Sequence, residues 1–129
     1  MIIGTGNDII DIRRIEKLLD EKFITRIFTP AEQATCDARK ERAASYAKRF
    51  AAKEAIAKAL GSGIGSDALF TEIEITNDER GAPHIALHGS ALARLQSFTP
   101  PGYITKIFLA LSDERDYAIA HAIIETIPA

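Results

Sequence analysis

Hydrophobic residues recur along the first 60 positions first with a period of two and then with the period of a helix. Residues 2–8 alternate and predict a strand, with Ile3 and Thr5 on one face and Gly4, Gly6 and Asp8 on the other. Apolar residues at helical spacing then predict a helix over residues 11–19. A short helical turn is expected over residues 23–28 and a long helix over residues 39–60.

Two chemical signals mark where these helices begin and end. Thr29 precedes Pro30, which suits the first position of a helix, and Glu32 completes the spacing of a capping box. Gly61 follows the long helix and predicts its C-terminal cap.

The second half of the chain returns to strand periodicity. Residues 71–76 read TEIEIT, which places Ile73 and Ile75 on the inward face, and turn residues then lead to a returning strand over residues 83–87. A short helix is expected over residues 89–96. Two further strands, over residues 103–112 and 117–127, are expected to flank a polar turn.

This order of elements predicts the α+β class, with a mostly antiparallel sheet packed against a long helix and shorter helices. At 129 residues, 47% of them hydrophobic and 26% charged, the chain is expected to form a single domain over residues 1–129. It is too short for a cleft between two large lobes.

Cysteine content and hydropathy indicate the compartment. Cys36 is the single cysteine, so an internal disulfide framework and a CxxC zinc or redox site are excluded. The start, MIIGTGND, has no basic stretch or apolar core of a leader, and no uncharged apolar run approaches the length of a membrane span. A cytoplasmic location is therefore expected, without membrane attachment.

The formal charge of −2 conceals two halves of opposite sign. Residues 1–60 hold 12 basic and 9 acidic side chains, a balance of +3, whereas residues 61–129 hold 4 and 9, a balance of −5. The densest basic stretch, residues 39–58, carries a net +5. Such a stretch favours an anionic partner, and the alternative is an ordinary solvated helix face.

Glu54 is the first candidate for chemistry, because it falls on the apolar side of the long helix. At about 100° per residue, Tyr46, Phe50 and Ala57 lie near one line, and Glu54 lies on the same face. An unpaired buried carboxylate costs several kcal/mol, roughly, so a partner is required. Either Lys58, four residues on, pairs with it, or Glu54 reaches into a site as a metal ligand or general base.

Asp8 is the second candidate. It shares a strand face with Gly4 and Gly6, whose missing side chains leave room for a ligand. The alternative is a helix N-cap for the helix that begins near Asp11. Two carboxylates beside a basic helix suit Mg²⁺, which takes few protein carboxylates together with water and phosphate oxygens. Lys53, Lys58 and Arg49 were the cations expected to neutralise the remaining phosphate charge.

The glycine-rich segment of residues 61–65 reads GSGIG and follows a helix. It is therefore neither a Walker loop nor a dinucleotide fingerprint, which both need a strand before the glycines. A helix cap with a flexible exit explains it, and glycine amides near Lys58 that touch a phosphorylated ligand are the alternative.

Four blocks together resemble the holo-acyl-carrier-protein synthase family, the small bacterial 4′-phosphopantetheinyl transferases. They read GTGNDIIDIRRIE, RFAAKEAIAKALGSGIG, TEIEI with GAPHI, and LALSDERDYAIAHAII, and they cover essentially the whole chain. The resemblance implies transfer of phosphopantetheine from coenzyme A to a serine of apo acyl carrier protein, with release of adenosine 3′,5′-bisphosphate. It also implies Mg²⁺ and a homotrimer with active sites at the subunit interfaces.

Site residues follow from the same resemblance, position by position. Asp8 and Glu54 match the metal-binding acids, and with Lys58 they form the implied catalytic set. The implied coenzyme A contacts are Arg49, Lys58, Gly61, Ser62, Gly63, Gly65, Pro83 and Ser112. The surface implied to dock the acidic carrier protein carries Arg14, Leu18, Lys22 and Arg26.

One departure from the family concerns the general base. Many members carry a histidine after the serine or threonine of the last strand pair, whereas this chain has Asp113 after Ser112. Glu54, Asp113 and a metal-bound water remain as candidates, and we favour a water activated through Glu54. The rival functions are a coenzyme A-binding module without catalysis and a nucleic-acid-binding module. The second is disfavoured by the acidic chain and by few aromatic residues in the basic stretch.

Overall fold

The computed structural model describes residues 1–129, and its elements are β1 (Ile2–Asp11), α1 (Ile12–Leu18), α2 (Glu21–Ile27), α3 (Pro30–Asp37), α4 (Arg42–Ala59), the 3-10 turn η1 (Phe70–Glu72), β2 (Ile73–Asn77), β3 (Pro83–Leu87), α5 (Gly89–Ser97), β4 (Tyr103–Glu114) and β5 (Tyr117–Pro128).

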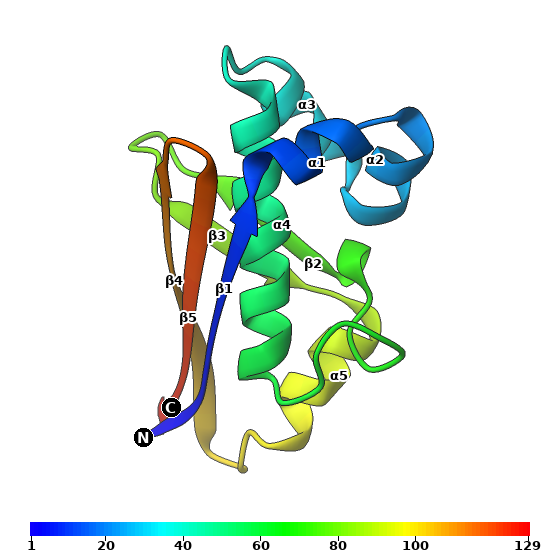
Figure 1. Cartoon of the computed structure of the whole chain (residues 1–129). Coiled ribbons are helices and arrows are strands. Elements are labelled where there is room, and N and C mark those ends of the chain that lie inside the picture. Colours follow the sequence, from blue (N-terminus) through cyan, green and yellow to red (C-terminus); the bar gives the residue numbers. More distant parts are fainter.

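Three antiparallel strands form one sheet, in the order β1-β5-β4, and β2 and β3 form a separate antiparallel hairpin. The long helix α4 packs along one face of the sheet, chiefly against β1 and β5. Figure 1 shows α1, α2 and α3 gathered at one end of α4 and α5 at the other, with the two chain termini side by side. The predicted α+β class is confirmed.

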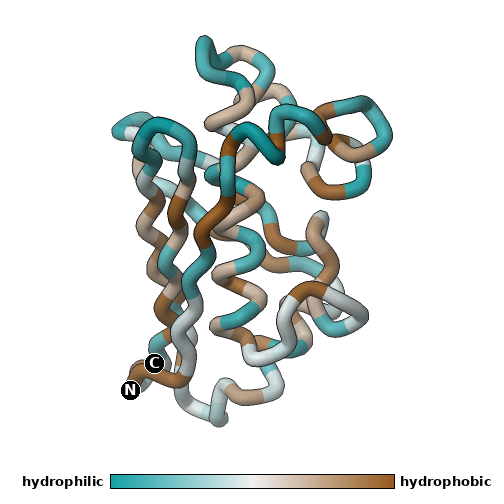
Figure 2. The backbone as a smooth tube through the Cα atoms, in the orientation of Figure 1, coloured by the Kyte–Doolittle hydropathy of each residue, from teal (hydrophilic) through white to brown (hydrophobic).

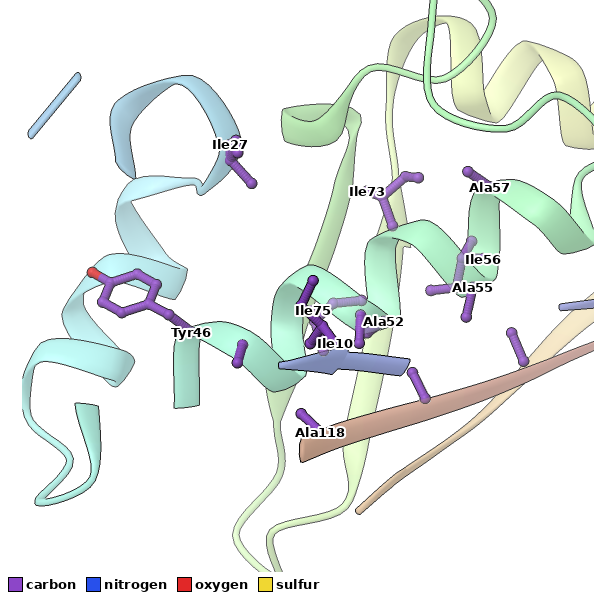
Figure 3. Packing of buried hydrophobic residues seen from close by; sticks show 14 of the residues in the cluster. Ile10, Ile27, Tyr46, Ala52, Ala55, Ile56, Ala57, Ile73, Ile75 and Ala118 are labelled. Carbon is purple, nitrogen blue, oxygen red and sulfur yellow. The ribbon is translucent and has the colours of Figure 1, made fainter. Parts of the chain in front are cut away.

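The core lies between α4 and the sheet, and small residues line both sides of it. Every second residue of β5 faces α4 and is buried, which brings Ala118, Ala120, Ala122 and Ile124 together. Figure 3 shows Ala118 and Ile10 close to Ala52 on α4, with Ile73 of β2 on the other side of the helix. Ile75 of β2 belongs to the same buried cluster. Alanine has only a methyl group to separate the backbones, so helix and sheet approach closely.

Glycines on β1 make the closest approach to α4. A Cβ at Gly6 would lie 2.0 Å from the carbonyl oxygen of Ala55, and one at Gly4 would lie 2.1 Å from that of Ala59. These neighbours are backbone atoms of α4, which cannot make room by a change of rotamer as a side chain can. The glycines therefore set how close β1 lies to α4.

Gly6→Ala is expected to lower the free energy of unfolding by about 3 kcal/mol, because overpacking here displaces backbone. Urea unfolding followed by circular dichroism measures the change. Gly65→Ala is the control, since a Cβ there meets nothing within 4 Å. Equal stability of the two variants would contradict the close approach.

Most predicted elements are confirmed, and several boundaries differ. The strand expected over residues 71–76 begins only at Ile73, because residues 70–72 form the turn η1. The capping box is present, since the Thr29 amide donates to Glu32 Oε1 at 2.8 Å and the Glu32 amide donates to Thr29 Oγ1 at 3.3 Å. The hairpin strand over residues 83–87 is as predicted. β1 continues to Asp11 because its last residues still pair with β5, and α4 begins only at Arg42.

The outer face of the three-stranded sheet is apolar as well. Ile9, Phe108, Tyr117 and Ile119 alternate with the buried positions of their strands and are each 45% exposed or more. Figure 2 shows hydrophobic residues along all three strands. Contiguous apolar surface of this kind marks a contact site for another molecule.

None of the helices combines the length and apolar composition that crossing a membrane requires.

Candidate active site

Asp8, Glu54 and Lys58 form a charged cluster where β1 crosses α4. Asp8 lies on the β1 face that also carries Gly6, and Glu54 and Lys58 are one turn apart on α4. The Lys58 ammonium donates to Asp8 Oδ1 at 3.3 Å and to the Asn7 carbonyl at 3.0 Å. The structure therefore brings together all three residues of the implied catalytic set.

The structure decides both alternatives that the sequence left open here. The N-cap of α1 is Asp11, which accepts the Arg13 amide at 2.9 Å, so Asp8 is not a helix cap. The ion pair of Lys58 is with Asp8, and no ion pair joins Lys58 to Glu54. Glu54 thus keeps its carboxylate free of a direct cationic partner within the chain.

Electrostatics in the cluster suit a divalent cation. Burial, and then the negative charge of Asp8, raise the pKa of Glu54, and Lys58 offsets this only in part. Two oxygen-donor carboxylates that repel each other fit Mg²⁺, which takes few protein carboxylates and fills its shell with water and phosphate oxygens. No group of three or more His, Cys, Asp or Glu side chains that could hold a metal ion occurs in the chain.

The raised pKa of Glu54 makes its carboxylate a source of instability in the metal-free protein. Because the pKa is higher in the folded state, the protonated side chain contributes to the free energy of unfolding below the ordinary pKa of 4.5. This contribution is lost as the pH rises through the raised pKa and the carboxyl group ionises. Glu54→Gln is therefore expected to raise the Tm of the metal-free protein at pH 7 and to change it less at pH 4. Thermal unfolding in a chelator measures this, and a lower Tm of the variant at pH 7 would contradict it.

The glycine-rich segment leaves the end of α4 in left-handed backbone. Gly61 and Gly63 have φ values of +78° and +64°, which favour glycine. Their amides donate to the Lys58 and Ala57 carbonyls at 2.9 and 3.0 Å. The Ser62 hydroxyl donates to the Gly63 carbonyl at 2.9 Å. The helix-cap interpretation is thus confirmed for this segment, which also starts beside Lys58.

Beyond Gly63 the segment is open. A Cβ at Gly63 or Gly65 would meet nothing within 4 Å, so the space beside both residues is free. Gly65 pairs with Ala68 in an isolated bridge that closes the loop. An open glycine loop next to Lys58 leaves room for a ligand there.

Arg49 and Pro83 lie at a second place, a cavity of about 420 Å³ at the start of α4. Its charged and amide lining comprises Arg39, Lys40, Glu41, Lys48, Arg49, Asn77 and Asp113. None of the charged cluster lines this cavity. Arg49 and Glu54 are five residues apart on α4 and therefore point about 140° away from each other.

Ser112 lies next to this cavity but on the other face of β4. It is exposed, and it is paired with Ile119 in the sheet register. The implied coenzyme A contacts are thus divided within one chain. Lys58 belongs to the charged cluster and the glycines follow it at the end of α4, whereas Arg49, Pro83 and Ser112 lie at or beside the cavity.

Lys53 has a structural position, so its expected contact with phosphate is wrong. Its side chain is fully buried and pairs with Glu32 at 2.8 Å. It also donates to the carbonyls of Phe70 and Ile73, which ties η1 and β2 to α4. The helical wheel carried a signal for this, because Lys53 lies only about 60° from Phe50 on the inward side.

The surface implied to dock a carrier protein is exposed on two helices. Arg14 and Leu18 lie on α1, and Lys22 and Arg26 lie on α2. All four are exposed, including Leu18, an apolar side chain that shows 42% of its surface. The arrangement is an apolar residue among basic ones, at the end of the molecule that α1 and α2 form (Figure 1).

The basic stretch of residues 39–58 does not form a continuous solvated face. Arg49 and Lys53 are buried, and Lys48 is paired with Asp113 at 3.2 Å. Arg42 is paired with Asp37 at 2.8 Å. A row of free cations tracking a nucleic-acid backbone is therefore absent, which counts against the nucleic-acid-binding alternative.

Comparison with known families identifies the class of protein to which this fold and this cluster belong. Residues 4–122 match the model of the 4′-phosphopantetheinyl transferase superfamily. The chain therefore belongs to this superfamily of transferases.

Similar proteins and solved structures identify the family within this superfamily. Holo-[acyl-carrier-protein] synthases of Mesorhizobium japonicum and Parvibaculum lavamentivorans are each 50% identical to this chain, cover 99% of it and are themselves covered to 96% and 98%. The crystal structure of the synthase from Neisseria meningitidis has a TM-score of 0.85 and 35% identity, with 97% of this chain and 99% of that chain covered. The chain belongs to the holo-[acyl-carrier-protein] synthase family of enzymes.

One further solved structure is described with a ligand. The holo-(acyl-carrier-protein) synthase from Bacillus anthracis, in complex with CoA (3′,5′-ADP), has a TM-score of 0.79 and 36% identity, and each chain is covered to 96%.

Proposed function

We propose that this enzyme transfers the 4′-phosphopantetheine group of coenzyme A to a serine of apo acyl carrier protein. The products are holo acyl carrier protein and adenosine 3′,5′-bisphosphate, and the reaction requires Mg²⁺. The observation that carries the proposal is the convergence of Asp8, Glu54 and Lys58 at one point of the surface, beside an open glycine loop. Family membership supplies the reaction class.

Each residue of the charged cluster has a role in this proposal. Asp8 and Glu54 hold Mg²⁺, which supplies positive charge to the pyrophosphate of coenzyme A when it is bound. The serine oxygen of the carrier forms a bond to the β-phosphorus, and the bond from that phosphorus to the bridging oxygen breaks. Lys58 stabilises the charge that develops on the leaving phosphate. The serine proton passes to a water oriented by Glu54.

The glycine-rich segment borders the substrate in the same proposal. Gly61, Ser62, Gly63 and Gly65 line the coenzyme A site next to Lys58. The open space beside Gly63 and Gly65 supports this, because a ligand can approach the backbone there without meeting a side chain. Arg49, Pro83 and Ser112 contact the nucleotide part.

Acyl carrier protein is proposed to dock on α1 and α2. Its acidic surface is complementary to Arg14, Lys22 and Arg26, and Leu18 supplies an apolar contact.

Arg14→Glu is expected to raise the KM for the carrier by about tenfold and to leave the KM for coenzyme A unchanged, because charge reversal at an interface acts mainly on association. Steady-state kinetics with each substrate varied in turn measures this. Arg80→Glu, in the exposed turn between β2 and β3, is the control. Equal carrier KM values for wild type and Arg14→Glu would rule out this docking surface.

A homotrimer with interfacial active sites completes the proposal. The resemblance implies this assembly, and two observations support self-association. The outer sheet face is apolar and exposed, and one chain cannot present Arg49 and Glu54 to the same small ligand. Light scattering after size-exclusion chromatography tests it, and a monomer at assay concentration would contradict it. The cytoplasmic location stays a prediction.

Incubation of the protein with coenzyme A, Mg²⁺ and apo acyl carrier protein tests the proposed reaction. Mass spectrometry is expected to show the carrier with a phosphopantetheine adduct, and a chelator is expected to abolish it. Absence of the adduct with every carrier offered would favour a module that binds coenzyme A without reacting.

A further inference from the structure

The cavity at the start of α4 has a mixed electrostatic composition. Arg39, Lys40, Lys48 and Arg49 supply four cations, and Glu41 and Asp113 supply two carboxylates. The excess of positive charge suits an anion. An acid within such a cavity is unexpected, because it repels the ligand that the cations attract.

Arg49 marks the cavity as a ligand site and not a solvated surface hollow. Only 4% of Arg49 is exposed, and its guanidinium donates to Ser45 Oγ at 3.1 Å and to Asn77 Oδ1. Its Nε is buried and has no hydrogen-bond partner in the chain. A buried donor without an acceptor is costly, and a phosphate oxygen would satisfy it.

Asp113 engages Lys48, one of the flexible cations that line the cavity. Lys48 Nζ lies 3.2 Å from Asp113 Oδ1, and both side chains are about one-third exposed. Lys48 has a flexible stem, whereas Arg49 is fixed by its two acceptors. A ligand phosphate must therefore compete with Asp113 for the Lys48 ammonium.

We propose that Asp113 is an affinity-setting residue, an internal counter-ion that weakens the hold of this cavity on a phosphomonoester. The inference rests on the proposed function, in which the pyrophosphate of coenzyme A lies at Asp8, Glu54 and Lys58. The 3′-phosphate is then the remaining dianion, and this cavity offers it four cations.

The consequence is a faster release of product. Adenosine 3′,5′-bisphosphate carries the same 3′-phosphate as coenzyme A, so a counter-ion that returns to Lys48 weakens both complexes alike. Asp113 acts on ligand affinity through Lys48. In this assignment it does not take the serine proton.

Asp113→Asn tests the inference by calorimetric titration with coenzyme A and with dephospho-coenzyme A, which lacks the 3′-phosphate. The variant is expected to bind coenzyme A and adenosine 3′,5′-bisphosphate roughly three- to tenfold more tightly. Its affinity for dephospho-coenzyme A is expected to stay unchanged. The gain should shrink as salt is raised, because the groups are partly exposed.

Two further variants give the matched controls. Glu114→Gln removes one negative charge at the neighbouring position, where the side chain is 87% exposed, and should leave all three affinities unchanged. In a Lys48→Met background, Asp113→Asn should lose most of its effect. Circular dichroism confirms that each variant is folded.

The outcomes separate the inference from the proposed function. Equal coenzyme A affinity in wild type and Asp113→Asn, or an equal gain for dephospho-coenzyme A, overturns the inference. A large fall in kcat of Asp113→Asn with unchanged affinity for coenzyme A also overturns the inference, because Asp113 would then be the proton acceptor. Absence of any transfer by the wild type would instead overturn the proposed function.

Discussion

Glu54→Gln is expected to lower the rate of phosphopantetheine transfer by about 10³-fold at saturating coenzyme A and Mg²⁺. The amide keeps the size of the side chain and its place on α4 but removes the negative charge. Asp8 would then face the cation as the single carboxylate, with its Oδ1 also engaged by Lys58 at 3.3 Å. The affinity for Mg²⁺ should therefore fall, and the pyrophosphate should be positioned less well for attack.

Two measurements separate this loss from a general loss of structure. The metal-free Glu54→Gln protein should unfold at a higher temperature than wild type at pH 7, because the raised pKa of Glu54 reports an unfavourable carboxylate. Glu79→Gln, in the exposed turn between β2 and β3, is the matched control and should transfer at the wild-type rate. Full activity of Glu54→Gln at saturating Mg²⁺ would show that the metal assignment is wrong.

Lys53→Met is expected to have the largest effect on stability, lowering the free energy of unfolding by about 3 to 5 kcal/mol. Lys53 and Glu32 are both fully buried, and their ion pair measures 2.8 Å. Burial lowers the pKa of Lys53, and the Glu32 charge opposes that shift. Removing the ammonium leaves the Glu32 carboxylate buried, with only the Thr29 and Ile75 amides as donors.

Urea unfolding followed by circular dichroism measures this loss, with Lys40→Met as the exposed control. The double variant Glu32→Gln/Lys53→Met should recover part of the stability, because no unpaired charge remains in the interior. A loss of less than about 1 kcal/mol for Lys53→Met would contradict the buried pair.

Local patterns predicted the elements because their causes lie within a few residues. The capping box needs only Thr29, Glu32 and the backbone between them. The turn that follows Asn77 is likewise local, so the hairpin could be predicted, although its register came only from the structure. Boundaries failed where the cause was distant, since β1 runs on to Asp11 because β5 continues to pair with it.

Glu54 could be singled out as a candidate for a related reason. A carboxylate on the apolar side of a helix needs a partner, and that requirement is visible in the sequence. Lys53 presented the same signal but was expected to contact phosphate. The sequence does not show which of two inward charges finds a partner inside the fold, and Glu32, which binds Lys53, lies 21 residues away.

The sequence by itself determined most of the helices and strands, the α+β class and the two acids to propose as candidates, because these depend on short-range periodicity and on residue chemistry. Only the tertiary structure decided that Lys58 pairs with Asp8, 50 residues away, and that Asp113 pairs with Lys48. It also separated the Arg49 cavity from the charged cluster. Such contacts depend on how close the backbones pack, and here the glycines of β1 and the alanines of α4 and β5 set that distance.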